Sequence, residues 1–159
     1  MLLLPIEYVV YKTKLTEEEV IKRLENNTDQ REIINFKFFS FPEKEFKGKV
    51  IGQVFKIQQT SFSRGFCLPV IIGVIENDSN QSTIIKVKMR LDIHDMIFTS
   101  FWCIFFLSML LTAKIEENFG IPLNLLLFGY GLVLLSFKYE SSCSIKDLKR
   151  IFEADIIKR

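Results

Sequence analysis

The chain has a single histidine, and acidic residues surround it at the start of a long apolar run. Asp92, His94 and Asp95 fall within four positions, and imidazole and carboxylate groups are the types that bind divalent metals or titrate near neutral pH. The same residues suit a second role, because the dipole of a helix stabilises acids at its N-terminus. We favour this second interpretation, a polar cap on an apolar helix, and predict no metal site.

A second group of polar residues lies in a loop predicted before the middle of the chain. Ser61, Ser63 and Arg64, together with the backbone amides near Gly65, are groups that can hold an anion such as a lipid phosphate. The alternative is an exposed arginine, or one that pairs with a local carboxylate. Arg64 is therefore a candidate anion or lipid contact.

The sequence contains no pattern of a known catalytic mechanism. It has no phosphate-binding P-loop, no nucleophile elbow, no zinc-protease helix and no dinucleotide-binding glycine motif. Its cysteines, Cys67, Cys103 and Cys143, form no C-x-x-C pair and have no histidine at metal spacing, which is typical of small buried or lipid-facing hydrophobic residues. We therefore predict a protein that is not an enzyme and needs no cofactor.

Basic residues alternate with apolar ones in two predicted strands. Because successive side chains of a strand point to opposite faces, these residues are expected to share one face of a sheet. They are Lys47 and Lys49 in one strand and Lys86, Lys88 and Arg90 in the other. Beside a membrane, each would gain about 1 kcal/mol from anionic headgroups. A merely solvated sheet face is the alternative, and the net charge of +2 is too small to indicate nucleic-acid binding.

Two uncharged apolar runs indicate where the chain resides. Met96–Ala113 has 18 residues and Ile121–Phe137 has 17, and the seven residues of Lys114–Gly120 join them. At about 1.5 Å per residue, each run would span about 25 to 27 Å as a helix, close to the bilayer core of about 30 Å. We expect residues 93–137 to form a transmembrane helical hairpin.

The distribution of charge predicts the orientation of this hairpin. Residues 1–95 contain 14 Lys or Arg and the segment after Phe137 contains six, whereas the loop between the spans contains one. Basic residues concentrate on the cytoplasmic side of membrane proteins. We therefore expect a two-pass protein of the inner (cytoplasmic) membrane with both ends of the chain in the cytoplasm.

Neither apolar run contains an acidic or basic residue, so an ion path through the hairpin has no visible relay. The aromatic residue Trp102 lies inside a span rather than at its end, which favours a role in helix packing. Small and polar residues are the other positions where two spans can meet. The candidates for helix–helix packing are Trp102, Ser108, Asn124, Gly129 and Gly131, and Asn124 could instead bond to a partner chain.

The remaining segments predict an α+β fold, a small, mainly antiparallel sheet with two short helices, interrupted by the hairpin. Strands are expected at residues 6–13, 33–41, 46–57, 66–75 and 82–91, with a bulge or bend near Val54. One helix has a capping box at Thr16 and Glu19, and the other at Ser144 and Asp147. Residues 138–142 fit a short strand or an extension of the second span. Residues 1–92 and 138–159 would then form one cytoplasmic domain.

Several segments together resemble an uncharacterised family of small two-span bacterial membrane proteins. The resemblance covers about 95 of the 159 residues. It rests on Phe46-x-Gly48, Ser63–Gly73, Thr83–Leu91, Trp102, Phe128-Gly129-Tyr130 and Glu140-Ser141. It implies a membrane-embedded protein of unknown function and supplies no active site.

Two functions fit these features. The first is a membrane-anchored cytoplasmic interaction module that binds a partner protein or anionic lipid headgroups. The second is a membrane effector or regulatory subunit that senses a small ligand and oligomerises through its spans, with a pocket lined by Phe38, Phe55, Phe66 and Arg64. The membrane lipid and a protein partner or second copy are the expected partners.

Overall fold

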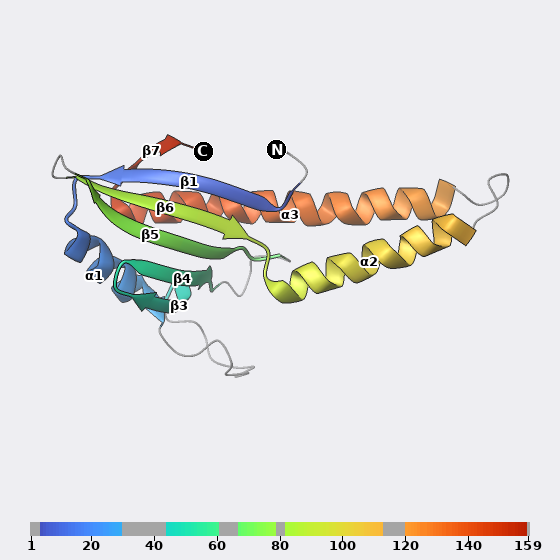
Figure 1. The fold of residues 1–159 in the computed structure, drawn as a ribbon, viewed down its shortest axis with the longest axis horizontal. Helices are drawn as coiled ribbons and strands as arrows, with labels where there is room; N and C mark the ends of the chain where they lie inside the picture. Colours follow the sequence, from blue (N-terminus) through green and yellow to red (C-terminus); the bar gives the residue numbers. More distant parts are fainter. Residues whose placement is uncertain (1–3, 30–43, 61–66, 79–81, 113–119, 159) are drawn as a thin grey trace.

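The computed structural model describes residues 4–29, 44–60, 67–78, 82–112 and 120–158. It has the α+β fold predicted from the sequence, with one sheet of seven described strands. A short helix, α1 (Glu17–Asn27), lies beside the sheet, and two long helices, α2 (Ile93–Thr112) and α3 (Gly120–Phe152), extend beyond its end (Figure 1). The strand predicted at residues 33–41 lies outside the described residues.

The described strands form a single mixed sheet in the order β2-β3-β4-β5-β6-β1-β7. Its β2–β3 pair is parallel and its other pairs are antiparallel, so the sheet is mainly antiparallel, as predicted. The strands are β1 (Ile6–Thr13), β2 (Thr28–Asp29), β3 (Phe46–Ile51), β4 (Val54–Gln59), β5 (Val70–Asp78), β6 (Ser82–Arg90) and β7 (Asp155–Lys158).

Helix α1 begins at the capping box that the sequence predicts. The Thr16 hydroxyl accepts a hydrogen bond from the Glu19 backbone N–H at 3.3 Å, and the Glu19 carboxylate accepts one from the Thr16 backbone N–H at 3.0 Å. These bonds satisfy N–H groups that would otherwise lack a partner at the helix start. The apolar stripe of the helix buries Val20 and Leu24 completely. The capping box fixes where α1 begins, and the apolar stripe fixes which of its faces packs against the sheet.

The prediction of one long strand over residues 46–57 is wrong, because a hairpin occupies this segment. Ile51 pairs with Val54 across a two-residue loop, and Gly52 adopts a positive φ of 55° there. Glycine adopts this conformation without strain and is preferred in two-residue hairpin loops. The change of alternation near Val54 marks this turn and not a bulge.

Strands β5 and β6 form a hairpin at the expected place in the chain. The alternation predicted for β6 is confirmed, because Ile85, Val87 and Met89 are buried while Lys86 and Lys88 are exposed. Strand β5 is displaced from its predicted position, since it begins after Pro69 and continues to Asp78. Proline lacks the N–H that a ladder requires, so the regular pairing starts only beyond it.

Helix α3 is continuous over 33 residues, from the second apolar run to the end of the predicted C-terminal helix. Of the two alternatives for residues 138–142, the extension of the second span is therefore correct. The capping box predicted at Ser144 and Asp147 is wrong. The Ser144 hydroxyl donates to Gln59 Oε1 at 3.0 Å, and Gln59 Nε2 donates to Asp147 Oδ2 at 2.7 Å. Spacing of three also places two residues on one helix face, and here that face binds β4.

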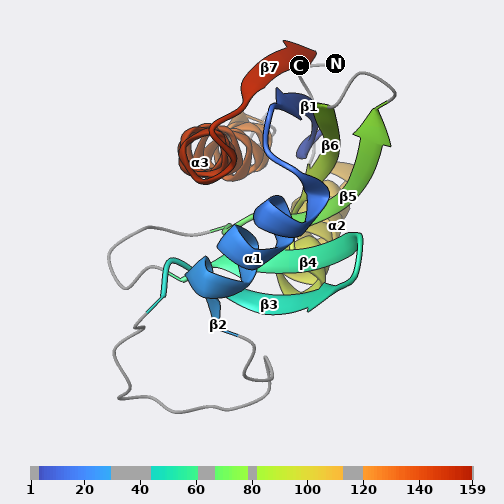
Figure 2. The same ribbon diagram turned by 90° about the vertical axis from the view of Figure 1, so that its left-hand side faces the viewer.

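The sheet has one covered face and one open face. Seen from its end, the sheet curves around α1, and α3 lies on the same side (Figure 2). Tyr11 and Phe55 of the sheet pack there against Phe152 of α3, with ring centroids 5.9 Å and 6.2 Å apart. The opposite face of the sheet has no described helix over it, and we call it the open face.

Helix α2 and the first half of α3 leave the sheet side by side (Figure 1). Both helices are long and apolar enough to cross a membrane, and only 6% and 11% of their most apolar stretches are buried. A core helix of a water-soluble protein would be mostly buried. Many of the described apolar side chains on this pair are instead exposed, among them Phe101, Leu111, Leu127 and Leu135.

Candidate functional site

The open face brings together the basic residues that alternate in the sequence. Lys49, Lys56, Ile72, Lys88 and Tyr8 are successive cross-strand partners from β3 to β1. Lys49 and Lys56 lie directly opposite each other, an arrangement in which like charges repel. The Lys88 ammonium lies 5.3 Å from the centre of the Tyr8 ring, within the range of a cation–π contact. The middle of this face is therefore positively charged.

Two acids of the open face lie at the end far from α2 and α3. Glu76 pairs there with Lys86 at 2.6 Å, and Asp78 pairs with Lys12 at 3.1 Å. At the near end, β6 finishes at Arg90, and two residues separate it from α2. The cross-strand row of Lys88 contains no acidic residue of the described strands, whereas the row of Arg90 ends at Asp29 of β2, the partner of Lys47. The row of Lys88 is therefore the basic part of this face.

An apolar row runs beside the basic one. Ile51, Val54 and Val74 are successive partners across β3, β4 and β5, and their exposed fractions are 73%, 48% and 37%. Exposed apolar rows next to charged residues are unusual on a surface that stays solvated, and they are common where another protein binds. The open face thus combines charge with apolar area.

The residues predicted to contact lipid differ in their surroundings. Lys86, Lys88 and Arg90 share the open face, but the carboxylate of Glu76 holds Lys86 with contacts of 2.8 Å and 2.6 Å. The Nε atom of Arg90 is buried and forms no hydrogen bond within the described part of the chain. Arg64 lies outside the described residues. Phe38 and Phe66 of the predicted small-ligand pocket also lie outside them, and Phe55 is fully buried in the core.

The segment around His94 joins β6 to α2. Asp92 precedes the helix, and its carbonyl accepts a hydrogen bond from the Met96 backbone N–H at 2.9 Å. His94 is exposed, and the Asp95 carbonyl accepts a hydrogen bond from the Thr99 hydroxyl at 2.7 Å. No three His, Cys, Asp or Glu residues of the described ranges are grouped to hold a metal.

An ion pair that the sequence did not predict lies where α3 reaches the sheet. Lys138 Nζ is 2.7 Å from Glu7 Oε1, and the Glu7 side chain is only 7% exposed. Lys138 is the first charged residue after the apolar run of α3. The two residues are 131 positions apart, so no local pattern in the sequence could connect them.

Helices α2 and α3 approach each other closely at Trp102 and Gly129. A Cβ atom placed on Gly129 would lie 2.5 Å from Trp102 Nε1, so only glycine permits this contact. On α2, Phe98 and Phe106 flank Trp102, with ring centroids 6.3 Å and 4.8 Å from its own. Two residues of the predicted packing set therefore meet.

The other three residues of that set do not lie between the helices. Ser108 is exposed and donates to the Phe105 carbonyl of its own helix at 2.7 Å. A Cβ atom on Gly131 would meet nothing within 4 Å, and Asn124 is exposed. The small or polar character of a residue does not reveal which side of the helix it occupies.

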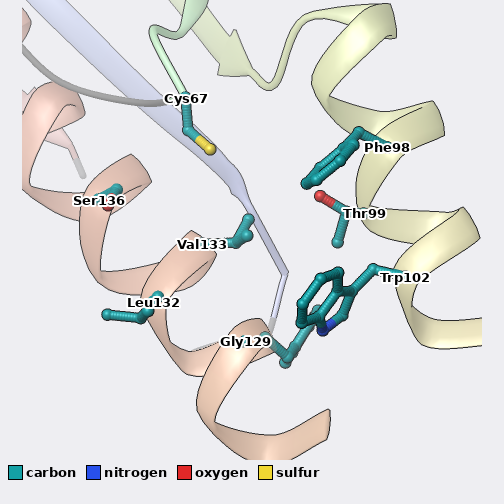
Figure 3. Close-up of a pocket in the computed structure, with 9 residues that line it drawn as sticks. Cys67, Phe98, Thr99, Trp102, Gly129, Leu132, Val133 and Ser136 are labelled. Carbon is teal, nitrogen blue, oxygen red and sulfur yellow. The ribbon is translucent and has the colours of Figure 1, made fainter. Parts of the chain in front are cut away.

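Between the Trp102–Gly129 contact and the sheet, the two helices flank a partly open cavity of about 470 Å³ (Figure 3). Phe98, Trp102, Leu132 and Val133 line it, and Cys67 points toward it from the segment before β5. Burial raises the pKa of the Cys67 thiol, and the negative charge of Asp95 raises it further. The thiol is therefore protonated at neutral pH and adds no charge to the cavity.

Comparison of the chain with protein-family models, with curated proteins and with solved structures found no match.

Proposed function

We propose that the chain is a membrane-anchored interaction module without catalytic activity. Helix α2 and the first half of α3 would form the anchor. The support is their exposed apolar surface, which is unfavourable in water and favourable in hydrocarbon. Alkaline carbonate washing of membranes that contain the chain tests the anchor. The chain stays in the pellet if the helices are inserted, and its release into the supernatant would contradict the proposal.

The sheet would then lie on the cytoplasmic side of an inner membrane. Arg90 before α2 and Lys138, Lys146 and Lys149 in α3 supply the basic flanks that the positive-inside rule requires. The strands β1 and β6 run in roughly the same direction as the long helices (Figure 1). In this orientation the strands would run roughly along the membrane normal. The open face would then stand perpendicular to the membrane surface.

The open face would bind an acidic partner protein. One observation carries this proposal: the basic row of Lys49, Lys56 and Lys88 lies directly beside the apolar row of Ile51, Val54 and Val74. Complementary charge would steer the partner, and the apolar row would be covered on binding. Because the face stands upright, lipid headgroups would reach only its near end, at Arg90. The Debye length of about 8 Å keeps the more distant lysines from interacting strongly with the bilayer.

Site-specific photocrosslinking tests this docking surface in the intact chain. A photoreactive amino acid at Ile51 is expected to form one discrete protein adduct in bacterial membranes. The adduct should disappear when Lys49→Glu and Lys56→Glu are added. The same amino acid at the exposed Glu18, on α1 at the covered side, is the control. Equal adducts from both positions, or an Ile51 adduct with the mass of a lipid, would contradict the partner protein.

A further inference from the structure

We propose that the cavity between α2 and α3 holds one acyl chain of a membrane lipid. This inference rests on the proposed membrane anchor, but it does not depend on a partner at the open face. The cavity volume of about 470 Å³ lies within the usual range of ligand sites, about 300 to 1,000 Å³.

The lining selects an apolar occupant. Phe98 and Trp102 of α2 face Val133 of α3 across the cavity (Figure 3), and Leu132 contributes to its lining. The Thr99 hydroxyl already donates to the Asp95 carbonyl, and the Cys67 thiol is protonated. An apolar lining of this kind favours hydrocarbon over water, because water finds too few hydrogen-bonding partners along it.

The position of the cavity matches the depth of lipid chains. On the side of the sheet, the nearest charged residues of the two helices are Asp95 and Lys138, and the cavity begins one turn or less beyond each. From Ser136 to Gly129 the lining extends along α3 by about 10 Å, at about 1.5 Å per residue. If those charged residues mark the headgroup level, the cavity lies where acyl chains begin.

One end of the cavity is closed, and the residue that closes it can report whether the cavity is occupied. The contact between Trp102 and Gly129 closes it on the side away from the sheet. Trp102 is also the only tryptophan of the chain, so its fluorescence reports this site alone. A lipid carrying bromine on its acyl chain quenches tryptophan on contact and can therefore be used as the probe.

The test uses the full chain in mild detergent, titrated with brominated phosphatidylglycerol. We expect saturable quenching of Trp102 at about one lipid per chain. Val133→Phe fills the cavity and should weaken this saturable binding at least tenfold. The matched control is Leu135→Phe, which adds the same ring to a side chain that is 69% exposed, and it should leave binding unchanged. Ser136→Leu narrows the cavity from another wall and should act like Val133→Phe.

Quenching that rises linearly and equally in the parent chain and all three variants would overturn the acyl-chain site. Saturable quenching that is unchanged by Val133→Phe and by Ser136→Leu would overturn it as well. The membrane anchor fails in a different way: the chain would then stay monodisperse in buffer without detergent. The two failures are therefore distinguishable.

Discussion

The two halves of α3 bury and expose opposite kinds of side chain. From Gly120 to Ser136 the helix exposes leucine and phenylalanine, whereas from Phe137 to Phe152 it buries an apolar stripe and exposes lysine. The backbone is the same regular helix throughout. The surroundings of each half of α3, and not its helical backbone, therefore determine whether apolar or charged side chains are exposed.

The largest effect should come from the buried half. Phe152→Ala removes a fully buried ring that packs on Tyr11 and Phe55, and we expect a loss of about 3 to 5 kcal/mol in the free energy of unfolding. Leu135→Ala truncates an exposed residue of the other half and should change stability in detergent by less than about 0.5 kcal/mol. Denaturant unfolding of both variants measures the difference. Similar losses would contradict the division of α3 into two environments.

The boundary between the halves should be the next most sensitive point. Lys138→Met removes the cation of this ion pair from the buried carboxylate of Glu7, and we expect a loss of about 3 kcal/mol in unfolding free energy. Adding Glu7→Gln should restore part of that loss, because the side chain at position 7 is then uncharged. Lys146→Met, at an exposed lysine of the same helix, is the control. Equal effects at Lys138 and Lys146 would exclude a stabilising role for the ion pair.

Within the exposed half, the contact between the long helices should give a smaller effect. Gly129→Ala forces the indole of Trp102 to move, and we expect a loss of about 1 to 3 kcal/mol and a shift of its emission maximum. Gly131→Ala meets no atom within 4 Å, so it should be neutral or slightly stabilising through its better helix propensity. An unshifted emission spectrum in the Gly129 variant would show that the helices do not meet there.

The smallest effect concerns the capping box of α1. Hydrogen bonds from the backbone N–H and side chain of Thr16 lower the pKa of Glu19 below its ordinary value of 4.5, and Arg23 lowers it further. A lowered pKa means that the carboxylate stabilises the fold above that value and that the contribution is lost as the pH falls through the folded pKa. The stability difference between the parent chain and Glu19→Gln should therefore shrink on acidification. Denaturant unfolding at neutral and acidic pH measures this stability difference. A difference that increases as the pH falls would contradict the lowered pKa of Glu19.

Local patterns were enough to predict the parts of the fold that local forces determine. The capping box of Thr16 and the alternation of β6 each lie within a few residues, and both are confirmed. The turn at Gly52 has a local signal as well, since glycine at the first loop position is typical of hairpins, but the change of alternation there also fits a bulge or bend within one strand. Strand β7 has four exposed residues and exists because β1 pairs with it, which a sequence pattern cannot reveal.

The candidate site residues also divide into those that a local pattern predicts and those that depend on contacts between distant segments. The alternation of Lys86, Lys88 and Arg90 predicts their common face, because a strand places every second residue together. The pairing of Lys86 with Glu76 and of Lys138 with Glu7 depends on which segments the fold brings together. The contact of Trp102 with Gly129 was within the predicted packing set, but the outward positions of Ser108 and Asn124 depend on the rotation of each helix about its axis.

The continuity of α3 has a mechanical consequence. A helix of 33 residues is a rod of about 50 Å, and no glycine or proline interrupts it between Gly131 and Phe152. Its far end is fastened to β1 and β4 through Tyr11, whose hydroxyl donates to the Ile145 carbonyl, and through Gln59. Tilting or rotating α3 at one end must then move the sheet attached at its other end. The helix therefore couples the two ends mechanically, as a rigid lever does.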